Sequence, residues 1–100
     1  MSEVRDLEET RTEIDSIDRQ LLALFCRRME LANDVAAYKQ AHGLPVLRPE
    51  REQEILEWAA EQSGPEFREF AVRLFGEVMR LSREYQDFLL KEWKKKETSE

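Results

Sequence analysis

The stretch LFCRRMELANDVAAYK, residues 24–39, decides the fold because its apolar residues recur at the spacing of an α-helix. Its apolar side is marked by Leu24, Leu31, Ala32 and Val35. Each helical residue turns the chain by about 100°, so Arg28 and Lys39 point within about 20° of each other. Both cations therefore lie inside the apolar side. Burial of an unpaired cation is costly, so each side chain needs an anionic partner or water.

The helical pattern extends to both sides of this stretch, because no Gly or Pro occurs from Ser2 to His42. We predict one helix of nearly forty residues, which is roughly 55 Å long at a rise of 1.5 Å per residue. A globule of this chain length is only about 26 Å across. The helix cannot bury its apolar side within one subunit, so we expect it to lie along a second copy of the chain.

Two breaks divide the rest of the sequence into two more helices. HGLPV, residues 42–46, ends the first helix, with Gly43 as a left-handed cap and Pro45 barring continuation. A second helix is expected to begin around Pro49, which suits a first helical position, and to bury Ile55, Leu56 and Ala59.

Ser63-Gly64-Pro65 ends the second helix, and a third is expected from about Glu66 to Trp93. Its apolar side comprises Phe67, Phe70, Ala71, Leu74, Phe75, Val78, Leu81, Tyr85, Phe88 and Leu89. The sequence therefore predicts an all-α fold of three helices (long, short, long) in a single domain over residues 1–100, paired as a homodimer.

Composition narrows the classes of function. The net charge of −6 argues against a nucleic-acid partner, because phosphate binding needs a basic surface. No apolar run approaches the ~20 residues that span a membrane, and MSEVRDLEET, residues 1–10, does not resemble a signal peptide. The single cysteine, Cys26, favours a cytoplasmic location. With His42 as the one histidine, we expect no zinc site.

Polar residues interrupt the apolar side of every predicted helix. Ser82 and Gln86 are four residues apart and stack on the apolar side of the third helix, and the second helix opens with Arg48, Arg51 and Glu52. One explanation is that the charged side chains reach the surface or pair with glutamates of another helix. A shared polar pocket, dominated by cations, explains all the interruptions together. Its natural occupant is a small anion with more than one carboxylate or phosphate.

Arg11 does not fit that pocket within one helix. It precedes Arg28 by seventeen residues, which is about 25 Å along the axis and about 100° around it. Taken alone, Arg11 is a surface residue. In an antiparallel dimer it could reach the pocket of the partner.

The motifs, taken in order, resemble the all-helical chorismate mutase family. The resemblance covers about Leu7 to Leu90. It rests on Arg11 and on three segments: IDSIDRQLLALFCRRMELANDVAAYK (14–39), PVLRPERE (45–52) and RLFGEVMRLSREYQ (73–86). It implies an intertwined helical homodimer that rearranges the dianion chorismate to prephenate, an isomerase of phenylalanine and tyrosine biosynthesis. It implies no cofactor and no metal.

The resemblance also assigns roles to individual residues. Arg28 resembles the arginine that grips a substrate carboxylate, and Arg11 the arginine donated across the dimer. Lys39 resembles the lysine that contacts a carboxylate and the ether oxygen of the breaking bond. Gln86 resembles the glutamine that donates to that oxygen, and Ser82 the serine beside a carboxylate.

At the start of the second helix, Glu52 resembles the acid that receives the ring hydroxyl, and Arg51 its neighbour in an Arg-Glu pair. Arg48 departs from the pattern, because close relatives often have an aspartate there. It also removes a good helix cap before Pro49, and it contributes backbone contacts or shields the site. Two alternatives share the residues: an isochorismate pyruvate lyase on the same fold, and a non-catalytic helical dimer.

Overall fold

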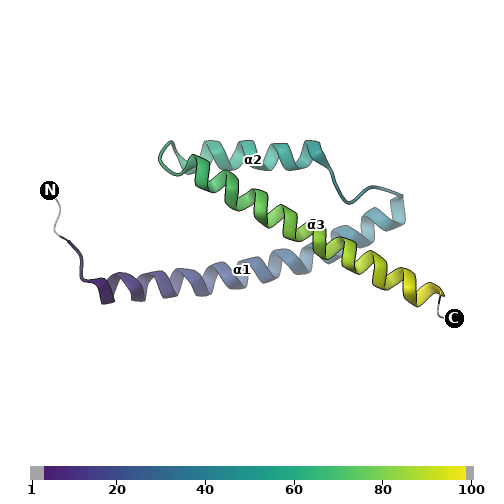
Figure 1. Cartoon of the computed structure of the whole chain (residues 1–100), viewed down its shortest axis with the longest axis horizontal. Helices are drawn as coiled ribbons and strands as arrows, with labels where there is room; N and C mark the ends of the chain where they lie inside the picture. The colour runs from purple at the N-terminus through teal and green to yellow at the C-terminus, as the bar shows by residue number, and fades with distance from the viewer. Residues whose placement is uncertain (1–3, 99–100) are drawn as a thin grey trace. The chain divides into compact units, whose positions relative to one another are not determined.

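Three α-helices make up most of the computed structural model, which describes residues 4–98 (Figure 1). The helices are α1, Leu7–His42; α2, Pro49–Ser63; and α3, Arg68–Thr98. No strand occurs within the described residues. The predicted all-α class, with the order long, short, long, is confirmed. None of these helices has both the length and the hydropathy that crossing a lipid bilayer requires.

The ends of α1 and α3 differ from the sequence prediction by a few residues. The first helix begins at Leu7 because Asp6 caps it: its carboxylate accepts the N–H of Glu9 at 3.1 Å. Ser2, where the Gly- and Pro-free stretch starts, lies outside the described residues. At the other end of the chain α3 continues past Trp93 to Thr98. Lysines suit the negative end of the helix dipole and support this extension.

Gly43 ends α1 in the predicted left-handed conformation, with φ of 65°. The N–H of Gly43 donates to the carbonyl of Gln40 at 3.4 Å, and the N–H of Leu44 donates to the carbonyl of Lys39 at 2.8 Å. These two bonds form a Schellman cap. The cap turns the chain back over the last turn of α1, directly at Lys39.

The chain divides into two compact units, Met1–Leu31 and Ala32–Glu100. The described part of the first unit is mostly the N-terminal portion of α1, and none of its residues is buried. Its apolar side is about half exposed or more at Ile14, Ile17, Leu21 and Leu24. Such exposure is expected of a helix that cannot bury its apolar side within its own subunit.

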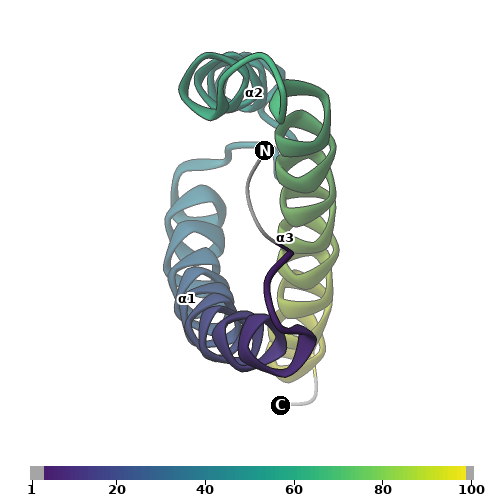
Figure 2. The ribbon, with the colours of Figure 1, turned by 90° about the vertical axis from the view of Figure 1, so that its left-hand side faces the viewer.

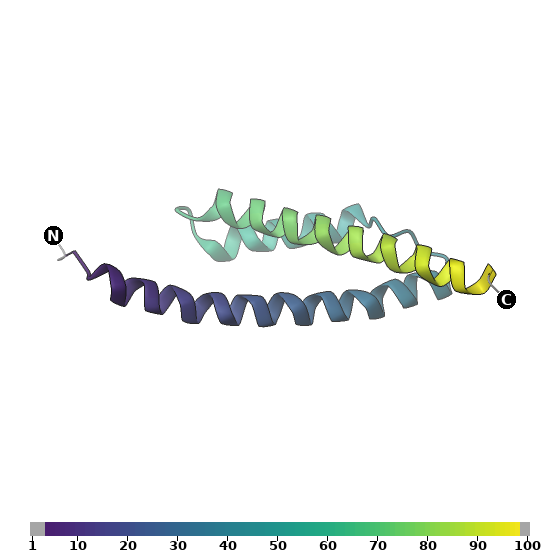
Figure 3. The same cartoon turned by 60° about the horizontal axis from the view of Figure 1, so that its bottom comes forward.

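The second unit contains the last turns of α1 together with α2 and α3. α2 and α3 lie side by side and are joined by a short turn (Figures 2 and 3). The rings of Trp58 on α2 and Phe75 on α3 pack edge to face, with centroids 5.5 Å apart. The buried apolar residues of this unit are Ala32, Ala36, Ala59, Met79 and Leu89. Ala59 is buried as predicted, whereas Ile55 and Leu56 are half-buried.

Candidate active site

The ammonium group of Lys39 occupies a buried polar site in the second unit. Lys39 lies in the last turn of α1 and is only 9% exposed. Its Nζ donates to the carbonyl oxygen of Val46 at 2.6 Å and to Oε1 of Gln86 at 3.1 Å. The Schellman cap makes the first contact possible, because it brings the loop after α1 back over Lys39. An ammonium group has three donors, so one hydrogen remains for a ligand.

Gln86 and Ser82 form the α3 side of this site. They are 4% and 7% exposed, and Nε2 of Gln86 donates to Oγ of Ser82 at 3.1 Å. The predicted stacking of these residues, one turn apart on α3, is confirmed. Because Oε1 accepts from Lys39, the amide group is oriented and Nε2 retains a second hydrogen. The site therefore offers at least two hydrogen-bond donors from α1 and α3.

Among the residues that the structure describes, no direct ion pair neutralises the charge of Lys39. Within residues 4–98, both hydrogen-bond acceptors of its ammonium group are neutral oxygens. Burial lowers the pKa of Lys39 below its ordinary value; the nearby positive charge of Arg48 also lowers it, while the carboxylate of Glu52 raises it. A buried cation that is held by neutral oxygens suits an anionic ligand.

Glu52 forms an ion pair with Arg83, which was not among the predicted site residues. The partners are Nη1 of Arg83 on α3 and Oε1 of Glu52 on α2. The two side chains are 30% and 22% exposed. One signal was available, since Arg83 directly follows Ser82, a predicted site residue. The carbonyl of Val46 was also missed, because a backbone oxygen has no signature in the sequence.

Arg48 and Arg51, the other predicted site residues at the start of α2, are exposed. Arg48 is the N-terminal flanking residue of α2 and makes no side-chain capping bond, although its carbonyl accepts the N–H of Glu52 at 3.1 Å. The predicted loss of a cap is thereby confirmed. Arg51 pairs with Glu54 at 3.3 Å on the exposed side of α2.

Arg11 and Arg28 belong to the first unit. Arg11 is exposed and pairs with Glu8, one turn away, at 3.5 Å. Arg28 is half-buried. The second unit thus brings together Lys39, Ser82 and Gln86, while the roles of the two arginines stay predictions.

Comparison with known proteins identifies the family. The family model described as "Chorismate mutase type II" matches residues 10–87. The T-protein of Haemophilus influenzae is 50% identical over 52 residues, which cover 52% of this chain and 14% of that protein. The chorismate mutase of Methanocaldococcus jannaschii is 44% identical over 52 residues, which are 52% of this chain and 52% of that protein.

A solved structure extends the likeness to the fold. A conserved hypothetical protein from Pyrococcus furiosus superimposes with a TM-score of 0.68 at 32% identity, covering 84% of this chain and 99% of that one. The matched part of the chain thus spans from about one seventh to about half of the two named relatives. Because the family model covers most of the sequence, the chain belongs to the chorismate mutase type II family.

Proposed function

We propose that this protein rearranges chorismate to prephenate. The observation that carries the proposal is the buried network in which Nζ of Lys39 and the amide of Gln86 are fixed side by side, with donors left over. Membership of the chorismate mutase type II family supports the same conclusion. The reaction belongs to phenylalanine and tyrosine biosynthesis, and we retain the cytoplasmic location as a prediction.

The reaction is an intramolecular Claisen rearrangement, in which one C–O bond breaks as one C–C bond forms. It needs no nucleophile and no proton transfer, but the flexible dianion must be held folded so that its two reacting carbons meet. Arg28, and Arg11 from a second copy, clamp the two carboxylates in this proposal. As the bond breaks, negative charge grows on the ether oxygen.

Donors that are already oriented toward this oxygen stabilise the transition state more than the ground state. Lys39 and Gln86 meet that requirement, because each is held by a second hydrogen bond before any substrate arrives. Lys39 is held by the carbonyl of Val46 and Gln86 by the hydroxyl of Ser82. Little reorganisation is then needed at the moment of reaction.

Assays with two substrates test this proposal against its nearest alternative. Purified protein is incubated with chorismate and with isochorismate, and the products are identified by chromatography and mass spectrometry. Prephenate from chorismate supports the proposed reaction. Salicylate and pyruvate from isochorismate, without prephenate, would instead indicate a lyase. Turnover of neither substrate would favour a non-catalytic helical module.

A second copy of the chain completes the site in this proposal. The support is the apolar side of α1, where Ile14, Ile17, Leu21 and Leu24 are 49–67% exposed in the single chain. Burying a fully exposed aliphatic side chain is favourable by roughly 1.5–3 kcal/mol, and these four side chains still have about half or more of their surface to bury. In such a dimer, Arg11 would contact the substrate bound in the site of the partner.

Mixing two inactive variants is expected to restore activity if Arg11 acts across the dimer. In a heterodimer of Arg11→Ala and Lys39→Ala subunits, one site receives both Arg11 and Lys39 intact. Random exchange then restores about one quarter of the wild-type activity. Activity is measured after the subunits are unfolded and refolded together.

The control mixture pairs Lys39→Ala with Gln86→Leu. These residues share a hydrogen bond within one chain, so every heterodimeric site lacks one of them and activity stays at background. Equal, negligible activity in both mixtures would show that Arg11 does not act in trans.

The dependence of activity on alkaline pH follows from the lowered pKa of Lys39. Lys39 must be charged to bind the dianion, so kcat/KM is expected to fall as pH rises through a pKa below about 10.4, the usual value for lysine. A bound dianion favours the charged lysine, so kcat declines at higher pH than kcat/KM. Measuring kcat and kcat/KM between pH 7 and 10.5 checks both declines.

The stability of the folded protein is expected to rise with pH over the range in which kcat/KM falls. Because the folded-state pKa of Lys39 lies below the unfolded value, burial of the charged lysine opposes folding at neutral pH. Deprotonation of Lys39 removes this cost as pH rises between the folded-state and the unfolded-state pKa values. The free energy of unfolding therefore increases with pH in that range. Urea unfolding at each pH measures it by comparison with Lys39→Met. A Lys39→Arg variant that kept the alkaline fall in kcat/KM would assign that fall to another group.

A further inference from the structure

The ion pair between Arg83 and Glu52 connects α3 to α2 at the edge of the proposed site. Arg83 binds Oε1 of the carboxylate. The other carboxylate oxygen has no hydrogen-bond partner among residues 4–98, and Glu52 remains 22% exposed. The pair therefore fixes the position of the carboxylate and leaves one oxygen able to accept a hydrogen bond.

Glu52 is close enough to Lys39 for its charge to affect that side chain electrostatically. The ammonium of Lys39 is bound only to neutral oxygens within the described residues. A mobile carboxylate nearby would be drawn to it and would take up the hydrogen that remains for a ligand. Within residues 4–98, however, Glu52 pairs with Arg83 on α3 and not with Lys39.

The sequence of this chain makes that restraint more important. Arg48 stands where the family resemblance puts an acid that helps to hold the ring hydroxyl of the substrate. Its side chain makes no capping bond, and its charge acts on Lys39 as a like charge. In the proposed mutase, the ring hydroxyl is therefore expected to be accepted by Glu52 alone.

We propose that Arg83 is a positioning residue, which holds the carboxylate of Glu52 so that its free oxygen accepts the ring hydroxyl of the substrate. This inference rests on the proposed mutase function. Arg83 itself does not touch the substrate. The competing explanation is that the pair only ties α2 to α3, in which case its loss lowers stability without any connection to the hydroxyl.

A double-mutant cycle separates the two explanations. Arg83→Gln is expected to lower kcat/KM by up to about 100-fold, because a displaced contact disturbs the bound geometry. The double variant Arg83→Gln/Glu52→Gln is expected to be no less active than Glu52→Gln alone, since Arg83 acts through Glu52. Arg83→Lys, which keeps the charge but loses the planar fork, recovers part of the activity.

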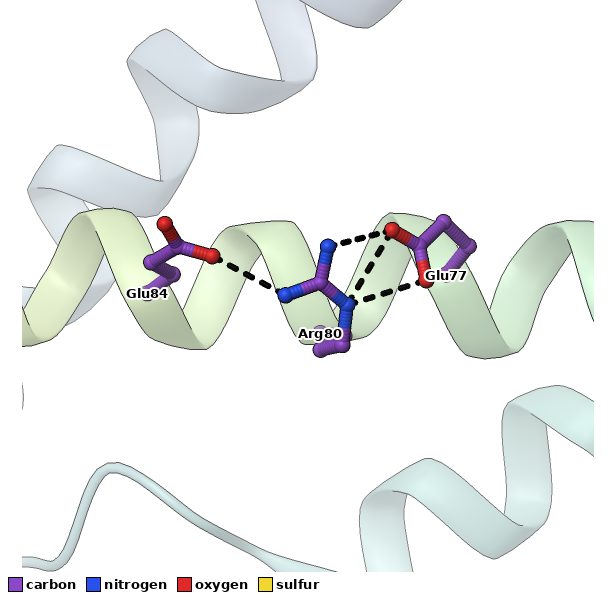
Figure 4. A network of polar contacts seen from close by, with 3 residues as sticks. All are labelled: Glu77, Arg80 and Glu84. Atoms are coloured by element: carbon purple, nitrogen blue, oxygen red, sulfur yellow. Dashed lines mark hydrogen bonds and ion pairs between the residues drawn. The ribbon is translucent and has the colours of Figure 1, made fainter.

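Arg80 provides the matched control on the same helix. It donates from Nε to Glu77 at 2.9 Å and from Nη1 to Glu84 at 3.0 Å, all on the exposed surface of α3 (Figure 4). Arg80→Gln therefore removes an equally well-paired arginine outside the site. We expect it to leave kcat/KM unchanged.

A substrate analogue gives a readout that a structural tie would not move. On the analogue of chorismate that lacks the ring hydroxyl, Arg83→Gln is expected to lose less kcat/KM than it loses on chorismate, because Glu52 has no hydroxyl to accept and only its pairing with Lys39 remains. An equal loss on chorismate and on the analogue would overturn the inference. Losses of kcat/KM that multiply in the double-mutant cycle would also overturn the inference.

The alkaline limb of kcat/KM supplies a third test. The charged groups that act on Lys39 are Arg48 and Glu52 on the α2 side, while its α3 neighbours Gln86 and Ser82 are neutral. In Arg83→Gln the released carboxylate pairs with Lys39, so the limb is expected to move to higher pH. Movement to lower pH, or none, would contradict the inference. A wild-type protein without mutase activity would overturn the proposed function, whereas an active one that fails these tests would overturn this inference alone.

Discussion

Replacing Lys39 by alanine is expected to lower kcat for the chorismate rearrangement by about 1000-fold, the upper end of the range for losing one donor to a developing oxyanion. The effect is large because Lys39 supplies both a hydrogen bond and a positive charge inside a buried site. Removing it also leaves the oxygens of Val46 and Gln86 without their donor. Steady-state kinetics on chorismate measures the loss.

The control for this prediction is Lys91→Ala, which removes an exposed lysine of α3 and is expected to keep wild-type kinetics. Leaving buried acceptors unpaired costs about 1–3 kcal/mol, but removing a buried charge offsets part of it. The free energy of unfolding should therefore change by less than about 4 kcal/mol, the rise in activation barrier that a 1000-fold loss of kcat represents. A Lys39→Ala protein that is folded and retains a tenth of wild-type kcat would refute the assigned role.

Replacing Gln86 by leucine is expected to lower kcat by about 100- to 1000-fold, again by loss of one oriented donor. Leucine keeps the approximate volume, so the loss reports on hydrogen bonding rather than on packing. It also removes the acceptor of Lys39 and the donor to Ser82. Kinetics at one pH, with circular dichroism to confirm the fold, measures this effect.

Gln86→Glu turns the same position into a pH-sensitive one. An ionised carboxylate cannot donate to the ether oxygen, and it would neutralise the ammonium group 3.1 Å away. We expect this variant to be active only at low pH, where the carboxyl is protonated, whereas wild type stays active through neutral pH. Gln62→Glu, on the exposed surface of α2, is the control and should follow the wild-type profile. Full activity of Gln86→Glu at pH 8 would disprove the account.

Local features of the sequence were enough to predict the three helices and their breaks. The end of α1 depends on Gly43 and on two backbone bonds that span a few residues, so a short stretch of sequence contains all that is needed. The pairing of Ser82 with Gln86 is local in the same way, since residues four apart on a helix are neighbours. Helical periodicity placed Lys39 on the apolar side of α1, but it did not decide between burial of the side chain and its reach to the surface.

Start and end residues of helices were less predictable. The absence of Gly and Pro shows where a helix is permitted, but the cap at Asp6 decides where α1 begins. Capping depends on one side chain that adopts one conformation, and Ser2, Asp6 and Thr10 near the N-terminus are all of residue types that cap helices.

Contacts between distant parts of the chain required the tertiary structure. Lys39 and Gln86 are 47 residues apart, and Glu52 and Arg83 are 31 apart; no helical period relates such positions. Which arginine pairs with Glu52 depends on how α2 lies along α3, and the carbonyl of Val46 enters the site because of the turn after α1. Residue types and spacing therefore specified the chemical groups, while packing selected their partners, because a hydrogen bond between helices is set by their relative placement and not by local backbone geometry.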